Sequence, residues 1–218
     1  MLISHKLKFV FIAVHKTGST TIRKSLSEYA DITGNPSKYS PFFWHVTAPV
    51  LKKKFDDEKW NWDSYFSFAF VRNPWERLVS AYSYRHKMVE RWKVNKPNGK
   101  FLESVFGSFK NELTNSKDFS EWVNKFVVNG QYGVAKPQHT YLVGRGDKLL
   151  VSFVGKLENM HSDFNFICDN IEIDRMTLDV VNKSTHKKYV DYYDETTKKL
   201  VDEFYKHDIS MFNYKFGD

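Results

Sequence analysis

The hydrophobic positions of the chain follow two patterns, short continuous runs and longer stretches with helical spacing. Runs rich in Val, Ile and Phe predict three buried strands, at residues 7–14, 65–71 and 151–154. Helical spacing and helix-start signals predict helices at residues 19–30, 47–55, 74–92, 119–128, 158–170 and 192–206. Because strands alternate with helices, the pattern predicts an α/β fold with a central parallel sheet flanked by helices.

Length and composition indicate a folded chain of one domain. The 218 residues are 41% hydrophobic and 17% aromatic, which is enough apolar surface for a sizeable core and excludes intrinsic disorder. We therefore expect a single domain over 1–218. The polar stretch KVNKPNGK at 93–100 has the composition of a loop and marks a candidate mobile insertion near 93–117.

The charge of the chain favours an anionic ligand. Lys and Arg number 33 against 26 Asp and Glu, a formal net charge of +7, which attracts phosphates, sulfates or acidic glycans. The apolar run at 9–14 is too short to span a bilayer, and the single Cys168 permits no intramolecular disulfide. We expect a soluble, cytoplasmic protein without a membrane span, although a form trimmed of a membrane anchor would have the same sequence.

The turn after the first strand has the chemistry of an oxyanion site. The segment HKTGSTT places Lys16 and Gly18 directly before the first predicted helix. A helix N-terminus offers unpaired N–H groups, glycine permits an unusual turn, and lysine adds a mobile positive charge. The segment is not the nucleotide-triphosphate P-loop, because its lysine precedes the glycine, and no acidic residue follows the second strand to hold Mg²⁺.

A second basic position follows the second strand. Arg72 stands at the carboxyl end of that strand, where ligands bind in open parallel sheets, and it can pair with a phosphate. An ion pair with Glu76 is the alternative. On the next helix Ser80 lies about 140° from Trp75, so we expect Ser80 not to be a packing residue.

Two segments together resemble a known family. HKTGSTTIR and FAFVRNPWERLVSAYSY are similar to the 5′-phosphosulfate loop and the 3′-phosphate signature of sulfotransferases that use 3′-phosphoadenosine 5′-phosphosulfate (PAPS), in particular the carbohydrate and heparan sulfate 2-O-sulfotransferase-like group, sulfotransferase family 2. WHVTAPVL, PQHTYL and VSFVGKLENMHSDF add to the resemblance, which covers most of the chain except about 88–117. It implies a three-layer, P-loop-like fold and transfer of a sulfuryl group from PAPS to an acceptor hydroxyl, most often of a carbohydrate.

The resemblance also implies which residues bind PAPS and its product adenosine 3′,5′-bisphosphate (PAP), without a metal. Lys16 would contact the 5′-phosphate and the bridging oxygen. The rest of this cradle would be Thr17, Gly18, Ser19, Thr20 and Thr21. Arg72 and Ser80 would hold the 3′-phosphate, and Lys187 and Lys188 would be secondary contacts to the 3′-phosphate or the adenine.

The acceptor hydroxyl must lose a proton, and histidine is the natural base near neutral pH. We expect His45 in this role, because its segment resembles the family's HxTA segment beside the acceptor cleft. His15, where the family often has a proline, and His139 are the alternatives. A carboxylate base is less favoured, because residues 33–49 contain no Asp or Glu.

Two other classes of protein remain as alternatives at this point. A kinase-like or nucleotide-hydrolysing enzyme would share the α/β fold, but the missing GK[ST] and Mg²⁺ carboxylate argue against it. A non-enzymatic polyanion-binding module would place its charge in an aromatic-studded stripe, whereas the basic residues that can be interpreted lie at strand ends. We therefore expect PAPS and a hydroxyl acceptor, a glycan, as partners, and no nucleic acid.

Overall fold

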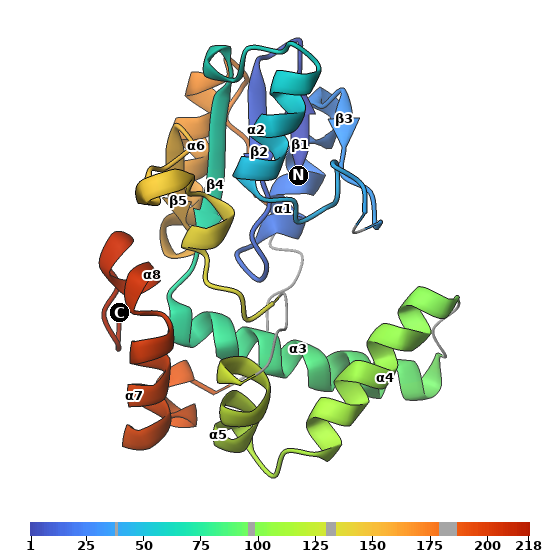
Figure 1. Ribbon diagram of the computed structural model, residues 1–218, viewed down its shortest axis with the longest axis vertical. Helices are drawn as coiled ribbons and strands as arrows, with labels where there is room; N and C mark the ends of the chain where they lie inside the picture. Colours follow the sequence, from blue (N-terminus) through green and yellow to red (C-terminus); the bar gives the residue numbers. More distant parts are fainter. Residues whose placement is uncertain (38, 96–98, 130–133, 179–186) are drawn as a thin grey trace. The chain divides into compact units, whose positions relative to one another are not determined.

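The computed structural model describes residues 1–37, 39–95, 99–129, 134–178 and 187–218. Its contacts group the chain into two compact units, Met1–Arg72 with Pro137–Lys183 and Asn73–Lys136 with Ser184–Asp218. The first unit contains the sheet, and the described part of the second unit is helical (Figure 1).

The sheet of the first unit has the strand order β3-β1-β2-β4-β5. The strands are β1 Leu2–Ser4, β2 Phe9–Ile12, β3 Ile32–Thr33, β4 Phe66–Val71 and β5 Phe153–Lys156. The pairs β2–β4 and β4–β5 are parallel, whereas β1 is antiparallel to both β2 and β3. The expected α/β fold with a parallel centre is therefore confirmed, and an antiparallel edge extends it. The strands β1 and β3 were not predicted, because they are too short to show a period.

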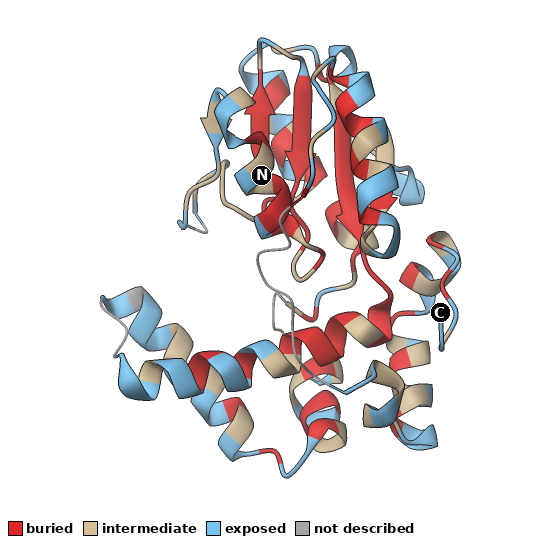
Figure 2. Cartoon of the chain, turned by 180° about the vertical axis from the view of Figure 1, so that it is seen from behind, coloured by how far each residue is buried: buried red, intermediate tan, exposed pale blue. Residues whose placement is uncertain are grey.

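Helices cover both faces of this sheet. They are α1 Ser19–Leu26, α2 Ala48–Asp57 and α6 Met160–Asn170. The rings of Phe11 and Phe68 share one buried cluster with Ile22 of α1 and Phe164 of α6. Side chains alternate along a strand, so the intervening residues face the opposite side, where α2 lies (Figure 1). The central strands are buried accordingly (Figure 2).

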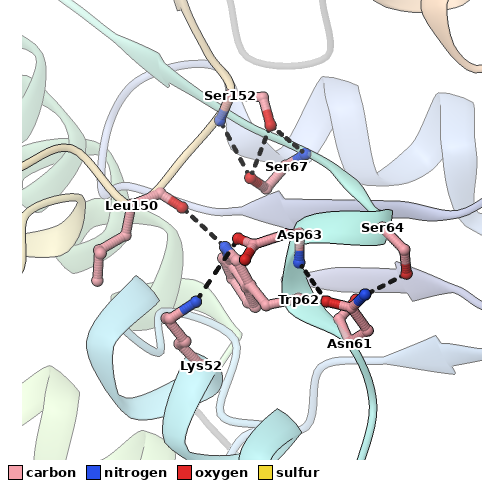
Figure 3. A network of polar contacts seen from close by, with 8 residues as sticks. All are labelled: Lys52, Asn61, Trp62, Asp63, Ser64, Ser67, Leu150 and Ser152. Atoms are coloured by element: carbon pink, nitrogen blue, oxygen red, sulfur yellow. Dashed lines mark hydrogen bonds and ion pairs between the residues drawn. The ribbon is translucent and has the colours of Figure 1, made fainter.

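A polar network fixes the start of β4 against the segment before β5 (Figure 3). The backbone N–H of Ser67 donates to the Ser152 hydroxyl oxygen, and the backbone N–H of Ser152 donates to the Ser67 hydroxyl oxygen. The Ser152 N–H also lies 2.7 Å from the Ser67 carbonyl oxygen. The indole N–H of Trp62 donates to the Leu150 carbonyl at 2.9 Å. These contacts join the chain ahead of the ladder and so help to set the register of β5. Short helical turns complete the unit: η1 Ser27–Tyr29, η2 Trp62–Ser64, η4 His139–Tyr141, η5 Arg145–Asp147 and η6 Leu157–Asn159.

The second unit is built on one long helix. Its elements are α3 Pro74–Val94, α4 Lys100–Thr114, α5 Phe119–Trp122, the π-helix η3 Val123–Val128, η7 Tyr189–Tyr192, α7 Glu195–Phe204 and α8 Lys206–Met211. Asn73 caps α3, because its side-chain oxygen accepts from the N–H groups of Trp75 and Glu76. Pro74 occupies the first helical position, as the sequence predicts.

The helix α4 lies within the segment where a mobile insertion near 93–117 was expected. The sequence analysis did not predict this helix. A buried ion pair between Arg85 and Glu112 joins α4 to α3, and the indole N–H of Trp122 donates to the same carboxylate at 3.0 Å. Residues 96–98 lie outside the described residues. The mobility of the segment and the single domain stay predictions.

The burial of α3 differs from the sequence expectation at Ser80. Leu78 and Val79 are buried, and so is Ser80, which is only 6% exposed. The expectation that Ser80 is not a packing residue is therefore wrong. The reason is that α3 has buried positions around most of its circumference, including Arg77 and Ala81, rather than along one stripe.

Within the described ranges, no helix is long and apolar enough to cross a membrane.

Candidate active site

The loop between β2 and α1 is held in an unusual backbone conformation. Lys16 and Gly18 both have positive φ angles, 66° and 75°. For lysine this left-handed conformation is strained, and such strain concentrates at functional turns. The hydroxyl of Thr17 donates to the Val14 carbonyl at 3.1 Å, and Thr17 is fully buried. Thr17 therefore stabilises the turn with its side chain, and its hydroxyl is engaged within the loop.

Gly18 allows α1 to begin close to α6 and the turn before it. A Cβ atom at this position would lie 2.8 Å from Leu157 Cδ1 and 3.2 Å from Met160 Cε. Among the described residues, no side chain caps the N-terminus of α1 at Gly18. The positive dipole end of α1 would therefore stabilise an anion beside Lys16. Among the predicted cradle hydroxyls, Ser19 and Thr21 are buried and Thr20 is exposed.

Arg72 reaches the same turn from the end of β4. Its guanidinium Nη1 lies 3.5 Å from the Lys16 carbonyl oxygen, and the residue is only 9% exposed. The structure thus brings Lys16 and Arg72 together, although they are far apart in the sequence. The side-chain amide of Gln138 holds the backbone of Arg72. The Arg72 N–H donates to Oε1 of Gln138 at 2.9 Å, and Nε2 of Gln138 donates to the Arg72 carbonyl at 2.8 Å.

Two histidines lie face to face next to this turn. The ring centroids of His15 and His45 are 3.5 Å apart with an interplanar angle of 25°. Nδ1 of His45 lies 2.8 Å from the Ala13 carbonyl oxygen. A carbonyl can only accept, so Nδ1 carries the proton and Nε2 carries the lone pair. His45 is therefore held in the tautomer that can accept a proton at Nε2.

The surroundings of His45 keep its ring neutral. Burial lowers the pKa of His45 to about 4, and the positive charge of Arg23 lowers it further. The hydrogen bond to the Ala13 carbonyl acts in the opposite direction and is outweighed. At neutral pH His45 is consequently an unprotonated acceptor.

The third candidate base lies in the turn that follows Gln138. His139 begins the short helix η4, and Tyr141 ends it. The ring of Tyr141 meets the ring of His15 edge-on, with centroids 6.1 Å apart. The same turn therefore contacts Arg72 through Gln138 and the histidine pair through Tyr141.

Three predicted donor contacts belong to the second unit. Ser80 lies in α3, two turns after Asn73, and is buried. Lys187 and Lys188 are exposed and directly precede η7. Their assignment to the 3′-phosphate or the adenine stays a prediction, and the remainder of the basic segment before them lies outside the described residues.

Sequence reasoning missed Gln138 and the contact between His15 and His45. Gln138 stands 66 residues from Arg72 in the chain, and a glutamine in a turn has no spacing that links it to a distant strand. Its segment PQHTYL was noticed only as part of the resemblance. Both histidines were candidate bases, but nothing in the sequence indicated that their rings stack.

No group of three or more His, Cys, Asp or Glu side chains that could hold a metal ion occurs in the part of the chain that the structure describes. The residues gathered at the carboxyl ends of β2 and β4 are instead cationic groups, helix N–H groups and histidines, which suit an anionic ligand and proton transfer. Comparison with protein families agrees with this chemistry. A family model described as the sulfotransferase family matches residues 1–215.

The chain therefore belongs to the sulfotransferase family and is a transferase. This match confirms the resemblance to sulfotransferase family 2. No curated protein and no solved structure matches the chain significantly.

Proposed function

We propose that the protein is a PAPS-dependent O-sulfotransferase whose acceptor is a carbohydrate hydroxyl. The observation that supports this most strongly is the approach of Arg72 to the Lys16 turn, with Nη1 3.5 Å from the Lys16 carbonyl. PAPS carries a phosphate at the 3′ position of its ribose and a phosphosulfate at the 5′ position. Two basic turns at the ends of adjacent parallel strands suit such a donor, and family membership favours sulfuryl transfer over other uses of phosphate-binding turns.

The donor would be bound without a metal. The uncapped N-terminus of α1, Lys16 and the cradle residues would hold the 5′-phosphosulfate. Arg72 would pair with the 3′-phosphate, with Ser80, Lys187 and Lys188 as further contacts. Gly18 fits this role because its positive φ and its missing side chain let the turn adopt this conformation while it packs against Leu157 and Met160.

When bound, PAPS supplies a sulfuryl group attached to a good leaving group. In an in-line transfer negative charge grows on the bridging oxygen, and the Lys16 ammonium would neutralise it. Nε2 of His45 would accept the proton of the acceptor hydroxyl as that oxygen bonds to sulfur. The Ala13 carbonyl fixes the tautomer of His45 and the ring of His15 restrains its plane.

The proposed acceptor class rests on family likeness and on charge. The net charge of +7 favours acidic partners, and a glycan that already bears carboxylate or sulfate groups fits this field. Turnover measured with labelled PAPS across a panel of neutral and acidic glycans tests this part of the proposal.

Donor binding is tested by calorimetry with PAP and AMP in the presence of EDTA. We expect PAP to bind more tightly than AMP, because only PAP has the 3′-phosphate. Arg72→Ala should weaken PAP binding by about 1.5–3 kcal/mol through loss of a charge-assisted pair, and should leave AMP binding nearly unchanged. Arg145→Ala is the matched control, since it removes the same charge from an exposed position of the first unit.

Three results would contradict the donor assignment. PAP binding no tighter than AMP binding would remove the 3′-phosphate site. A melting temperature raised by ATP with Mg²⁺ but not by PAP would favour a kinase or a nucleotide hydrolase, and one raised only by an oligonucleotide would favour a polyanion-binding module.

A further inference from the structure

Gln138 has a position that its sequence context does not explain. Its side chain is fully buried, and its amide makes two hydrogen bonds to one residue, Arg72. Oε1 accepts from the Arg72 N–H at 2.9 Å and Nε2 donates to the Arg72 carbonyl at 2.8 Å. A single side chain therefore satisfies both backbone groups of the residue that directly follows β4.

This contact begins where the sheet ends. The parallel register of β4 with β5 stops at Val71, opposite Lys156, and the register with β2 stops at Ala69, opposite Ile12. Arg72 is buried, and buried backbone polar groups need partners. The Gln138 amide presents one donor and one acceptor side by side, as a neighbouring strand would, and so extends the ladder by one residue.

The extension fixes the backbone from which the Arg72 side chain starts. With its N–H and its carbonyl both bonded, the backbone of Arg72 cannot rotate without breaking two hydrogen bonds. From this fixed backbone the guanidinium extends to the Lys16 turn, where Nη1 lies 3.5 Å from the Lys16 carbonyl oxygen. Preorganisation of this kind strengthens ligand binding, because the arginine is already ordered before the anion arrives.

We propose that Gln138 is a positioning residue for recognition of the donor 3′-phosphate, acting through Arg72. This inference rests on the proposed function, since it assigns the selectivity for the 3′-phosphate at the same site. Gln138 itself touches the backbone of Arg72 and has no role in the transfer chemistry. The selectivity is the ratio of the AMP and PAP dissociation constants.

The test is a double-mutant cycle measured by calorimetry. Gln138→Met keeps the length of the side chain and removes both hydrogen bonds. We expect the dissociation constant for PAP to rise about tenfold, while that for AMP changes by less than about twofold. In the Arg72→Ala background the same substitution should change PAP binding by less than about twofold, because its effect passes through the Arg72 guanidinium.

Thr140→Val is the matched control. It removes a hydrogen bond within the same turn, from the Thr140 hydroxyl to the Pro137 carbonyl at 2.6 Å, and should leave the selectivity of the wild type. If Gln138→Met does not fold, Gln138→Glu takes its place in the cycle. This variant keeps the acceptor for the Arg72 N–H and loses the donor to the Arg72 carbonyl.

The outcomes separate this inference from the proposed function. A wild-type protein without preference for PAP over AMP contradicts the donor assignment itself. If the wild type has the preference and a folded Gln138 variant retains it, the positioning role is wrong. Equal weakening of PAP and AMP binding, or an undiminished effect in the Arg72→Ala background, would mean that Gln138 only stabilises the fold.

Discussion

His45 combines a backbone carbonyl on Nδ1, a stacked ring on its face and a low pKa of about 4. A base must be unprotonated to act, so its rate contribution is lost as the pH falls through its pKa. We therefore expect the acid limb of kcat/KM to lie near pH 4 rather than near 6.5. His45→Gln should lower turnover by about 10² to 10⁴ and leave PAP affinity unchanged, as checked by pH–rate profiles and calorimetry.

The same pKa gives a stability control for this prediction. The folded-state pKa lies below the ordinary value of 6.5, so between about pH 6.5 and pH 4 the unfolded chain binds more protons at His45. The free energy of unfolding should fall as the pH drops through this window, and less steeply in His45→Gln. An acid limb near pH 6.5, or an active His45→Gln enzyme, would move the role of base to His15 or His139.

At the scale of single residues, the sequence predicted those parts of the site that depend only on a few neighbouring positions in the chain. Lys16 and Gly18 were assigned to an anion-binding turn because a strand, a glycine and a helix start occur within a short segment. Arg72 followed from the end of the next strand. The stacking of His15 on His45 and the Gln138 contact depend on chain segments that return from elsewhere in the fold, which no local pattern encodes.

At the scale of elements, β5 must contain a residue without a side chain. A Cβ at Gly155 would lie 2.8 Å from Cε1 of the buried Phe70, its register partner in β4. Gly155→Ala should therefore destabilise the protein by about 1–3 kcal/mol, because the phenyl ring cannot move aside in a packed core. Thermal or urea unfolding followed by circular dichroism measures the change.

Gly107 provides the opposite expectation. It lies in α4, and apart from its chain neighbours and its own helix backbone no described atom lies within 4 Å of an added Cβ. Gly107→Ala should therefore stabilise the protein by up to about 1 kcal/mol through helix propensity. If Gly155→Ala and Gly107→Ala destabilised the protein equally, the contact of Phe70 with Gly155 would not be the reason that β5 needs a glycine at this position.

The elements that the sequence predicted are those with a long period or a clear boundary. The parallel strands β2, β4 and β5 and the helix α3 belong to this group. The strand β3 has two residues and β1 has three, so neither can show an alternation. The helix α4 was not predicted, because Pro97 and Gly99 before it indicated a loop that would extend through the residues of α4.

At the scale of the molecule, the family match runs through both units, since residues 1–215 include nearly the whole chain. The donor part of the site could be proposed from the sequence because phosphate recognition uses strand ends and helix starts, which carry strong local signals. The acceptor class is proposed only from family membership and from the net charge.

The left-handed backbone conformation of Lys16 lowers the stability of the fold at a residue that we propose acts in catalysis. A lysine with φ of 66° costs the fold about 1 kcal/mol relative to glycine, so the residue that would neutralise the leaving group is also one that weakens the protein. Lys16→Gly and Lys16→Ala should both lose turnover, yet Lys16→Gly should melt at the higher temperature. At the helical Lys24 the order should reverse, with alanine the more stable. In the proposed mechanism, the contribution of Lys16 to turnover would offset this cost in stability.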